Sequence, residues 1–460
     1  MTVRGLVHQF SSNSIVLSCV LVVTVCTVVA ASVSSLSSTR VEAAEPAFVH
    51  PGVLVNKAQL STTRVKISQN KQPWTTALAR AQQSAPGQAT YQPQAYSVVI
   101  CSVGTPDHPS CQAEVDDALA AYTQALLWNY TNNRAHARAA IRILNAWGTK
   151  LQYHTSQLDG SPDPAGATGV AGVYGNASWA GDLFARAAEL TRYTGAGWSS
   201  ADAAKFQAML RRAFLPKLTD EAQVGANMRF SIASANTGIG VFLDDRAVFN
   251  LGVEQWRRSV PSTIYLNSDG AKPPKPINNP SGRNLQWCWN TTAECEAYAE
   301  SLGVAYGGRA VLSKYSEGIQ AETCRDAGHL SMGIASMFDT AETAYIQGLD
   351  LYNEQRARLI AVMEYNTRML RYNQGQLSNG STRPSGWVCP PFSSSTSWGT
   401  TTVKPTSNTW DIAYNHFRGR LGVNLPNTAA YLQEVTASDR RPQKSAKLMQ
   451  AWETLTHGYN

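Results

Sequence analysis

Apolar positions along the chain recur mainly at the spacing of a helix. In 114–131, "EVDDALAAYTQALLWNYT", one stripe holds Ala118, Ala121, Tyr122 and Leu126, as in a helix that packs on one side. The same character extends over 134–151, 177–195, 200–218, 231–261, 323–348 and 350–375. Gly, Pro, Asn and Asp separate these stretches, as expected at helix ends. Alternating patterns that indicate strands are scarce, so the sequence predicts an all-α protein.

Helix hairpins that follow one another can stack in a line or close into a ring. The chain has no sharp repeat of fixed period, which argues against a regular solenoid. We therefore predict an (α/α) toroid of antiparallel helix hairpins. Irregular stretches interrupt the helices at 82–98, 267–284 and 393–408. They suit binding loops and surface excursions equally.

The N-terminus has the layout of a secretory signal. Arg4 and His8 precede an apolar run at 15–31, and small residues follow it, in the order that export signals use. The run is shorter than the ~20 apolar residues of a membrane span; an uncleaved signal anchor is the alternative. We expect residues 1–44 to be signal and leader, and 45–460 to form a single domain, secreted and free of the membrane.

Cysteine usage agrees with export. Cys19 and Cys26 lie in the predicted signal, and six cysteines remain, at positions 101, 111, 288, 295, 324 and 389. An even number in an oxidising compartment indicates disulfides, for which 15 connectivities exist. Pairing between cysteines close in sequence favours the disulfides Cys101–Cys111 and Cys288–Cys295. This leaves Cys324 to pair with Cys389. The spacing does not match a zinc site. Glycosylation triplets begin at Asn129, Asn176, Asn290 and Asn379.

Charge and composition narrow the partners. The chain carries a formal net charge of +7, with 43% hydrophobic and 15% charged residues. A modest positive balance favours an anionic partner. Nucleic acid is disfavoured because dense blocks of Lys and Arg with interleaved aromatic residues are missing. We expect an anionic polysaccharide as partner, a monomer, and neither a metal nor a cofactor.

One polar stretch breaks the apolar pattern. In 318–333, "GIQAETCRDAGHLSMG", a helical interpretation places Glu322, Arg325, Asp326, His329 and Met332 within an arc of roughly 120°. The apolar positions that follow share or flank this face. Buried charge is unfavourable unless it is paired or used. The stretch therefore predicts either a functional site or an internal network of ion pairs.

Two further segments carry candidate chemistry. Asn227 opens the helix of "VGANMRFSIASANTGIGVFLDD", where it either caps the helix or holds a ligand at its positive end. The acids that end this run, Asp244 and Asp245, favour ordinary ion pairing. The second segment, 410–422, is "WDIAYNHFRGRLG" and supplies further polar side chains. These are Tyr414, His416 and Arg420.

The residues resemble the alginate lyase-like family of polysaccharide lyases. The matching pieces include "FVHPGVLV", "AIRILNAWGTKL", "WAGDLFARAAELTRYTGAGW", "QAETCRDAGHLSMG", "IQGLDLY" and "WDIAYNHFRGRLG", and they spread over most of the mature chain. The resemblance implies a helical (α/α) toroid. It also implies cleavage of a polymer of uronic acids, of alginate or glucuronan type, by β-elimination.

The resemblance further implies roles for particular residues. Such a lyase must neutralise the substrate carboxylate so that charge can spread into it as the neighbouring proton leaves. Asn227 and Arg325 are similar to the residues that do so in the family, and Glu322 would support Arg325.

His and Tyr side chains suit the proton transfers. His329 would be the base or would orient it. Tyr414 would protonate the leaving oxygen. His416 and Arg420 would contact the substrate.

The chain departs from the family pattern at two positions. Met332 stands where relatives have a tyrosine, two turns after the arginine, and Met228 stands where some have a histidine. The proton-transferring groups would then come from elsewhere, from Tyr414 or Tyr315. Two other functions remain open. One is a glycoside hydrolase that pairs Asp244 or Asp245 with Glu322, and the other is a carbohydrate-binding protein without activity.

Overall fold

The computed structural model describes residues 46–101, 108–164, 171–219, 226–271, 273–274, 315–323, 327–373, 388, 410–437 and 451–459. From Ala47 onward they belong to one compact unit, Ala47–Asn460. The predicted signal lies outside these residues. Within the described residues, no helix is long and apolar enough to cross a membrane. In the same ranges, no group of three or more His, Cys, Asp or Glu side chains could hold a metal ion.

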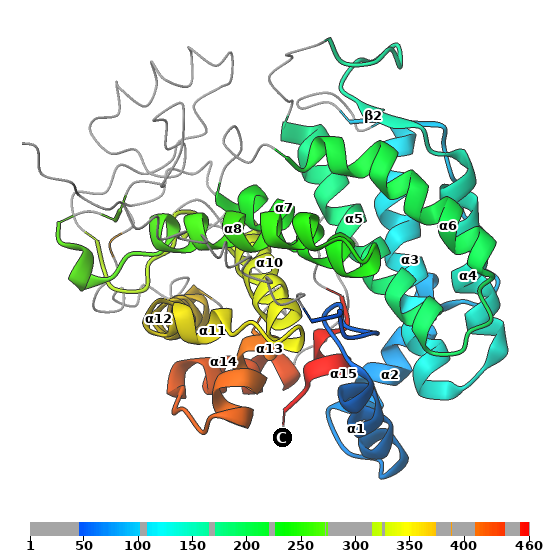
Figure 1. Ribbon diagram of the computed structural model, residues 1–460. Helices are drawn as coiled ribbons and strands as arrows, with labels where there is room; N and C mark the ends of the chain where they lie inside the picture. The colour runs from blue at the N-terminus through cyan, green and yellow to red at the C-terminus, as the bar shows by residue number, and fades with distance from the viewer. Residues whose placement is uncertain are drawn as a thin grey trace, which may run out of the picture. The chain divides into compact units, whose positions relative to one another are not determined.

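The unit is built from helices that follow one another along the chain (Figure 1). Long helices in chain order are α3 (Pro109–Thr131), α4 (Arg134–Lys150), α5 (Ala171–Tyr193), α6 (Ser200–Met209), α7 (Ala226–Phe242), α8 (Arg246–Thr263), α10 (Ala327–Ile346) and α12 (Arg356–Asn373). Helix α4 packs on α3 and α8 on α7, whereas α6 packs on α4. The short helix α11 (Leu351–Glu354) connects α10 to α12. The prediction of a mostly α protein is confirmed. The predicted stretch 231–261 is two helices, because the chain turns through Asp244 at a φ of 52°.

The helices form two rows. We call α3, α5, α7 and α10 the inner row, because α3 packs on α5, α5 on α7, and α7 on α10. Nearly every described side chain of this row is buried. The covering helices α4 and α8 alternate buried with exposed positions instead. A helix that is apolar all round belongs in a core, and an amphipathic one at its surface.

The inner helices run in the same direction, because a covering helix returns the chain between each pair. The contacts agree with this. Near the starts of α5 and α3, Asn176 donates to Glu114 at 2.7 Å. Trp179 of α5 packs against Met332, near the start of α10. The N-terminal ends of the inner helices therefore meet. We call this the amino end of the inner row, and helix dipoles make it positive.

Short elements close the row. On one side α13 (Asp411–Tyr414) packs on α10, and α15 (Glu453–His457) packs on α13. On the other side α1 (Lys57–Ser68) and α2 (Trp74–Gln83) pack on both α15 and α3. The helix α14 (Pro426–Ala437) covers α12. The order of neighbours thus returns to its starting point, as in a ring of helices.

A small parallel pair of strands, β1 (Val98–Ile100) and β2 (Tyr153–Thr155), lies beside the start of α3. The disulfide Cys101–Cys111 follows β1 directly and joins it to α3. This pairing was the local one that the sequence favoured, and it is confirmed. The other predicted pairs lie outside the described residues.

A buried cluster of charges joins α5, α10 and α15. The guanidinium of Arg186 meets Asp182 at 2.5 Å, Asp339 at 2.6 Å and Glu453 at 4.0 Å. Burial raises the pKa of Glu453 to about 7, although Arg186 acts in the opposite direction. Burial therefore keeps a proton on Glu453 when the pH is below about 7.

The segment before α1 crosses the other end of the inner row. His50 bonds Glu189 of α5 at 3.0 Å and Asp244, just after α7, also at 3.0 Å. Gln347, just after α10, accepts from Val49 N at 2.8 Å and donates to Gly52 O at 3.1 Å. This segment therefore ties together the carboxyl end of the inner row, opposite the amino end.

Candidate active site

Asn227 lies at the amino end of the inner row, one residue inside α7, which begins at Ala226. Its side chain is 1% exposed. The Oδ1 atom accepts from the backbone N–H of Met228 at 2.8 Å. Among the described residues, the Nδ2 atom has no hydrogen-bond partner. Asn227 thus holds a buried amide donor that no neighbour in the described ranges uses, which favours a ligand over a helix cap.

The polar stretch 318–333 contains the start of α10, but its first part is not helical. The helix begins at Ala327. Before it, Gln320 pairs with Ile264 in an antiparallel bridge, and Ala321 N donates to Thr263 O at 2.9 Å. The prediction of a helix is therefore wrong for 318–323. Backbone pairing with the end of α8 satisfies these groups instead.

The residues predicted from this stretch have different outcomes. Glu322 is buried, with 1% exposure, and its backbone N–H donates to Gln320 Oε1 at 2.6 Å. His329 is half-buried in the first turn of α10. Arg325 lies outside the described residues. The structure thus brings Glu322 and His329 to the amino end of the inner row, where Asn227 lies.

Met332 is buried in the position that the family pattern gives to a tyrosine. It is 3% exposed and packs against Trp179, which is 9% exposed. A thioether beside an aromatic ring fills space favourably. Met332 therefore serves packing at this place.

A network that sequence reasoning missed lies beside the site. The Glu114 carboxylate bonds His154 Nε2 at 2.8 Å and accepts from Asn176 Nδ2 at 2.7 Å. His154 Nδ1 lies 3.0 Å from Ala213 O. All three side chains are buried. The only sequence signal was a charged residue, Glu114, at the start of an apolar helix.

Comparisons with known proteins agree with the helical fold. The alginate lyase family model matches residues 102–273. The crystal structure of alginate lyase A1-III from Sphingomonas species A1 superposes with a TM-score of 0.55, over 90% of this chain and 97% of that one, at 14% identity. Part of the chain is therefore similar to the alginate lyase family, and its fold is that of an alginate lyase structure.

Two further structures resemble this alginate lyase-like chain. A variant of alginate lyase A1-III complexed with tetrasaccharide has a TM-score of 0.54 at 14% identity, over 90% of this chain and 98% of its own. An alginate lyase from Bacteroides ovatus has a TM-score of 0.50 at 12% identity, over 89% of this chain and 99% of its own. No curated protein matches the chain in sequence. At these identities the structures establish the fold, and the predicted (α/α) toroid is confirmed.

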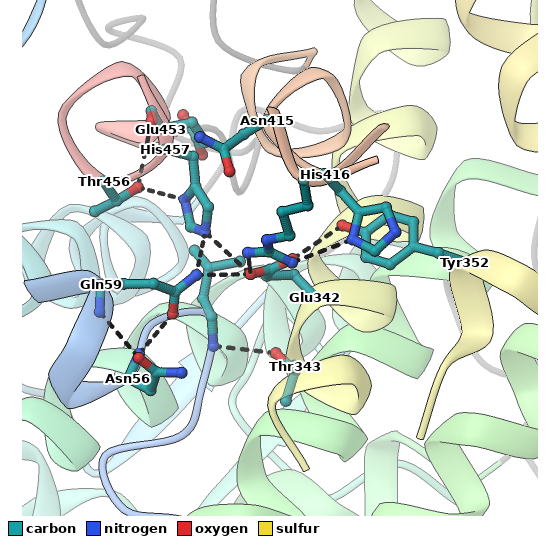
Figure 2. Close-up of polar contacts among 12 residues, drawn as sticks. Asn56, Gln59, Glu342, Thr343, Tyr352, Asn415, His416, Glu453, Thr456 and His457 are labelled. Carbon is teal, nitrogen blue, oxygen red and sulfur yellow. Dashed lines mark hydrogen bonds and ion pairs between the residues drawn. The ribbon is translucent and has the colours of Figure 1, made fainter. Parts of the chain in front are cut away.

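The structure does not bring the third predicted segment of this alginate lyase-like chain to the amino end. His416 stacks on Tyr352 at 3.7 Å and lies 3.1 Å from Arg420 Nη1. Burial and the charge of Arg420 lower the pKa of His416 to about 4. Figure 2 shows His416 over Tyr352, beside Glu342.

Arg420 pairs with Glu342 of α10, donating to its Oε2 at 3.0 Å. Gln59 of α1 donates to Oε1 at 2.7 Å, and Tyr352 to Oε2 at 3.2 Å (Figure 2). Thirteen residues separate His329 from Glu342 along α10, which is about 20 Å. These contacts support a role of Arg420 in closing the ring of helices. Substrate contact by His416 and Arg420 stays a prediction.

Tyr414 precedes this cluster by two residues. Its ring meets Tyr459 edge-on, with 5.3 Å between centroids. Burial raises its pKa. Tyr414 therefore lies on the segment that packs against the end of α10 opposite to His329. Its role as proton donor stays a prediction.

The acids considered for a hydrolase also lie at the carboxyl end. Asp245 caps α8 by accepting from Val248 N at 3.2 Å, and it pairs with Arg211 at 2.5 Å. Asp244 bonds His50. The length of α7 separates both acids from Asn227 by about 25 Å. The sequence favoured ion pairing of these acids with Arg246 or nearby lysines. The structure pairs both acids, with Arg211 and His50 as partners.

Proposed function

We propose that this alginate lyase-like chain cleaves a uronate-containing anionic polysaccharide, of alginate or glucuronan type, by β-elimination. One observation carries the proposal most directly. Asn227 offers a buried amide N–H at the positive end of the inner helices, where a carboxylate is electrostatically favoured. The family match supports the lyase reaction.

The carboxylate is the chemical difficulty of this reaction. The proton on C5 of a uronate is weakly acidic, because the adjacent carboxylate is already negative. Hydrogen-bond donors fixed around that carboxylate let it accept more charge as the proton leaves. Asn227 would supply such a donor. Arg325, outside the described residues, is the second proposed partner of the carboxylate.

The proton transfers follow from this arrangement. We assign the base to His329, which would remove the C5 proton. The electron pair of the C5–H bond then forms the C4–C5 double bond, and the bond from C4 to the glycosidic oxygen breaks. That oxygen takes up a proton. The products are an unsaturated uronate and a new reducing end, and no water is consumed.

The sequence offered Tyr414 and Tyr315 as donors of that last proton. Of the two we propose Tyr315, because Tyr414 lies on the segment that packs against the end of α10 opposite to His329. Burial raises the pKa of Tyr315, whose ring lies 5.2 Å from that of Tyr265. Tyr315 is five residues from Gln320 along the chain, on the segment that precedes α10. Substituting each tyrosine by phenylalanine tests them: the true donor loses turnover, and the other variant keeps it.

A panel of polyuronates separates the proposed reaction from the alternatives. The purified mature protein should release products that absorb in the ultraviolet, together with new reducing ends. Reducing ends without ultraviolet absorbance would mean hydrolysis. Binding without either product would mean a carbohydrate-binding protein. The distance of Asp244 and Asp245 from Asn227 argues against hydrolysis by these acids.

A matched pair of variants tests Asn227 itself. Asn227→Ala should lower kcat/KM by roughly 10²-fold, the usual loss for one donor to a developing anion. Asn236→Ala is the control on the same helix: it is buried, but its Nδ2 is already bonded to Leu218 O and Gln255 Oε1, each at 2.8 Å. The control should lose stability and keep its kcat/KM.

We also propose that the protein is exported and acts as a monomer. The apolar run at 15–31 with a basic start supports export. Expression through a secretory pathway should release a protein whose first residue falls between Ser32 and Glu45. Light scattering should give the mass of one chain.

A further inference from the structure

Gln320 is a buried glutamine whose amide orientation is determined by its contacts. Its side chain is 1% exposed. The Oε1 atom accepts from the backbone N–H of Glu322 at 2.6 Å. Because the oxygen is the end that meets a donor, the nitrogen is the end left over. Within the described ranges, Nε2 has no hydrogen-bond partner.

The segment that carries Gln320 is held in place on both sides. Gln320 N donates to Thr323 Oγ1 at 2.9 Å, and Thr323 donates in turn to Asn366 Oδ1 at 2.7 Å. The backbone bridge to Ile264 fixes the other side. The amide of Gln320 is therefore positioned before any ligand arrives.

Asn227 repeats this arrangement on α7. In both residues the side-chain amide oxygen accepts a hydrogen bond from a backbone N–H. In both, the amide nitrogen donates to no acceptor among the described residues. A buried donor without an acceptor reduces stability. Two such donors at one place are unusual in a core, and they suit a site that binds an acceptor.

Gly333 shows that the two amides are neighbours. A Cβ built on this glycine would lie 3.3 Å from Asn227 Cβ and 3.4 Å from Gln320 Nε2. Both side chains therefore border the same small region at the start of α10. His329 lies one turn earlier on that helix.

We propose that Gln320 is a second amide donor to the substrate carboxylate, beside Asn227, and that it selects acidic over neutral sugars. This inference rests on the proposed function. A carboxylate presents two oxygens with several lone pairs and so accepts from two amides at once. Neutral amides attract the anion without a buried charge of their own. A neutral hexose has a hydroxymethyl group instead, with a single uncharged oxygen to meet both donors, and would therefore bind less tightly.

The test compares Gln320→Met and Gln320→Glu with Gln255→Met. Methionine keeps the length of the side chain and removes the donor. Glutamate keeps the acceptor for Glu322 N and replaces the free donor by a negative oxygen. Gln255 is the control, since it is buried and its Nε2 already donates to Leu218 O at 3.1 Å.

We expect Gln320→Met to lower kcat/KM on a polyuronate by roughly 10²-fold and Gln320→Glu to lower it further. Gln255→Met should lower the melting temperature and keep kcat/KM. Calorimetry with an oligo-uronate and its carboxyl-reduced counterpart gives a second measurement. The wild type should prefer the acid, and Gln320→Met should lose most of that preference.

A folded Gln320→Met protein that keeps kcat/KM within twofold, or keeps the preference for the acid, would overturn the inference. If Gln320→Met does not fold, Gln320→Glu decides in the same way. The proposed reaction fails separately, when the wild type gives no unsaturated product. In that case, a preference for the acid that disappears in Gln320→Met would still support the role of Gln320 in binding.

Discussion

Gly333 of α10 lies so close to Asn227 of α7 that a Cβ on the glycine would stand 3.2 Å from the Asn227 Cα. This is tighter than most side chains tolerate, so the glycine permits the two helices to approach. The approach places Asn227 beside Gln320. A residue without chemistry of its own thus determines the geometry of the site.

Gly333→Ala should therefore lower kcat/KM with little change in the melting temperature. The added methyl group displaces Asn227 and Gln320, while the better helix propensity of alanine, worth about 1 kcal/mol, offsets the strain. Steady-state kinetics and thermal unfolding of the same sample give both quantities.

Gly238→Ala is the matched control for that variant. It lies in α7 with contacts of similar tightness, 3.1 Å to Val53 Cγ1 and 3.3 Å to Ala185 Cβ, but more than two turns from Asn227. It should keep kcat/KM. An equal loss of kcat/KM in both variants would show that helix packing in general, and not the two amides, controls activity.

Arg420→Ala should destabilise the protein and leave the activity of the folded fraction unchanged. It would remove the arginine from the fully buried carboxylate of Glu342, whose pKa His457 and Arg420 hold well below its ordinary value. Gln59, Tyr352 and His457 would remain as partners. Removing one partner of a buried ion pair costs about 3–5 kcal/mol. Chemical denaturation measures this loss, and Arg420→Ala combined with Glu342→Gln should recover part of it. A folded Arg420→Ala protein with weakened substrate binding would instead support the substrate contact predicted from the sequence.

Glu453 should make stability depend on pH. Burial raises its pKa to about 7, so the folded protein binds this proton more tightly than the unfolded chain does. Its contribution to stability is complete below about pH 4.5 and is lost as the pH rises through 7. In Glu453→Gln, the melting temperature should fall less between pH 5 and pH 8.

The neighbours Asp182 and Asp339 remain in that variant, so the difference between the two curves reports Glu453. Glu434→Gln is the control, because this glutamate is exposed and pairs with Arg371 at the surface. It should leave the pH dependence unchanged. The raised pKa of Glu453 would be refuted by a wild-type melting temperature that stays constant or rises from pH 5 to pH 8, with the same curve in Glu453→Gln.

Removing the disulfide Cys101–Cys111 should lower the free energy of unfolding by about 3 kcal/mol. The cysteines are 10 residues apart, and closing a loop of that size restricts the unfolded chain. Denaturation of the double variant Cys101→Ser/Cys111→Ser measures the effect. Since the disulfide joins β1 to α3, kcat/KM should persist at low temperature.

Most of the helical architecture could be predicted from the sequence, because each covering helix carries its own apolar stripe. Predictions were poorest where backbone pairing replaced a helix, at 318–323. There, the partners of Gln320 and Ala321 come from the end of α8, more than 50 residues earlier. Local periodicity contains no information on such a partner.

The site shows the same division. The residue types at Asn227, Glu322 and His329 indicated carboxylate binding and proton transfer, and the structure brings them to one end of the inner row. Gln320 and Gly333 were not singled out, because an amide and a glycine are ordinary until their neighbours are known. His416 and Arg420 have suitable chemistry, but the structure places them beside the C-terminal part of α10, away from Asn227 and His329.

The sequence by itself determined most of the helices and the kinds of side chain available, because these depend on periodicity and residue type. Only the tertiary structure decided which polar groups share a place. That choice depends on helix direction and on close contacts between distant residues, as Gly333 makes with Asn227 and Gln320. Burial then decides which amide nitrogens keep a free donor for a ligand.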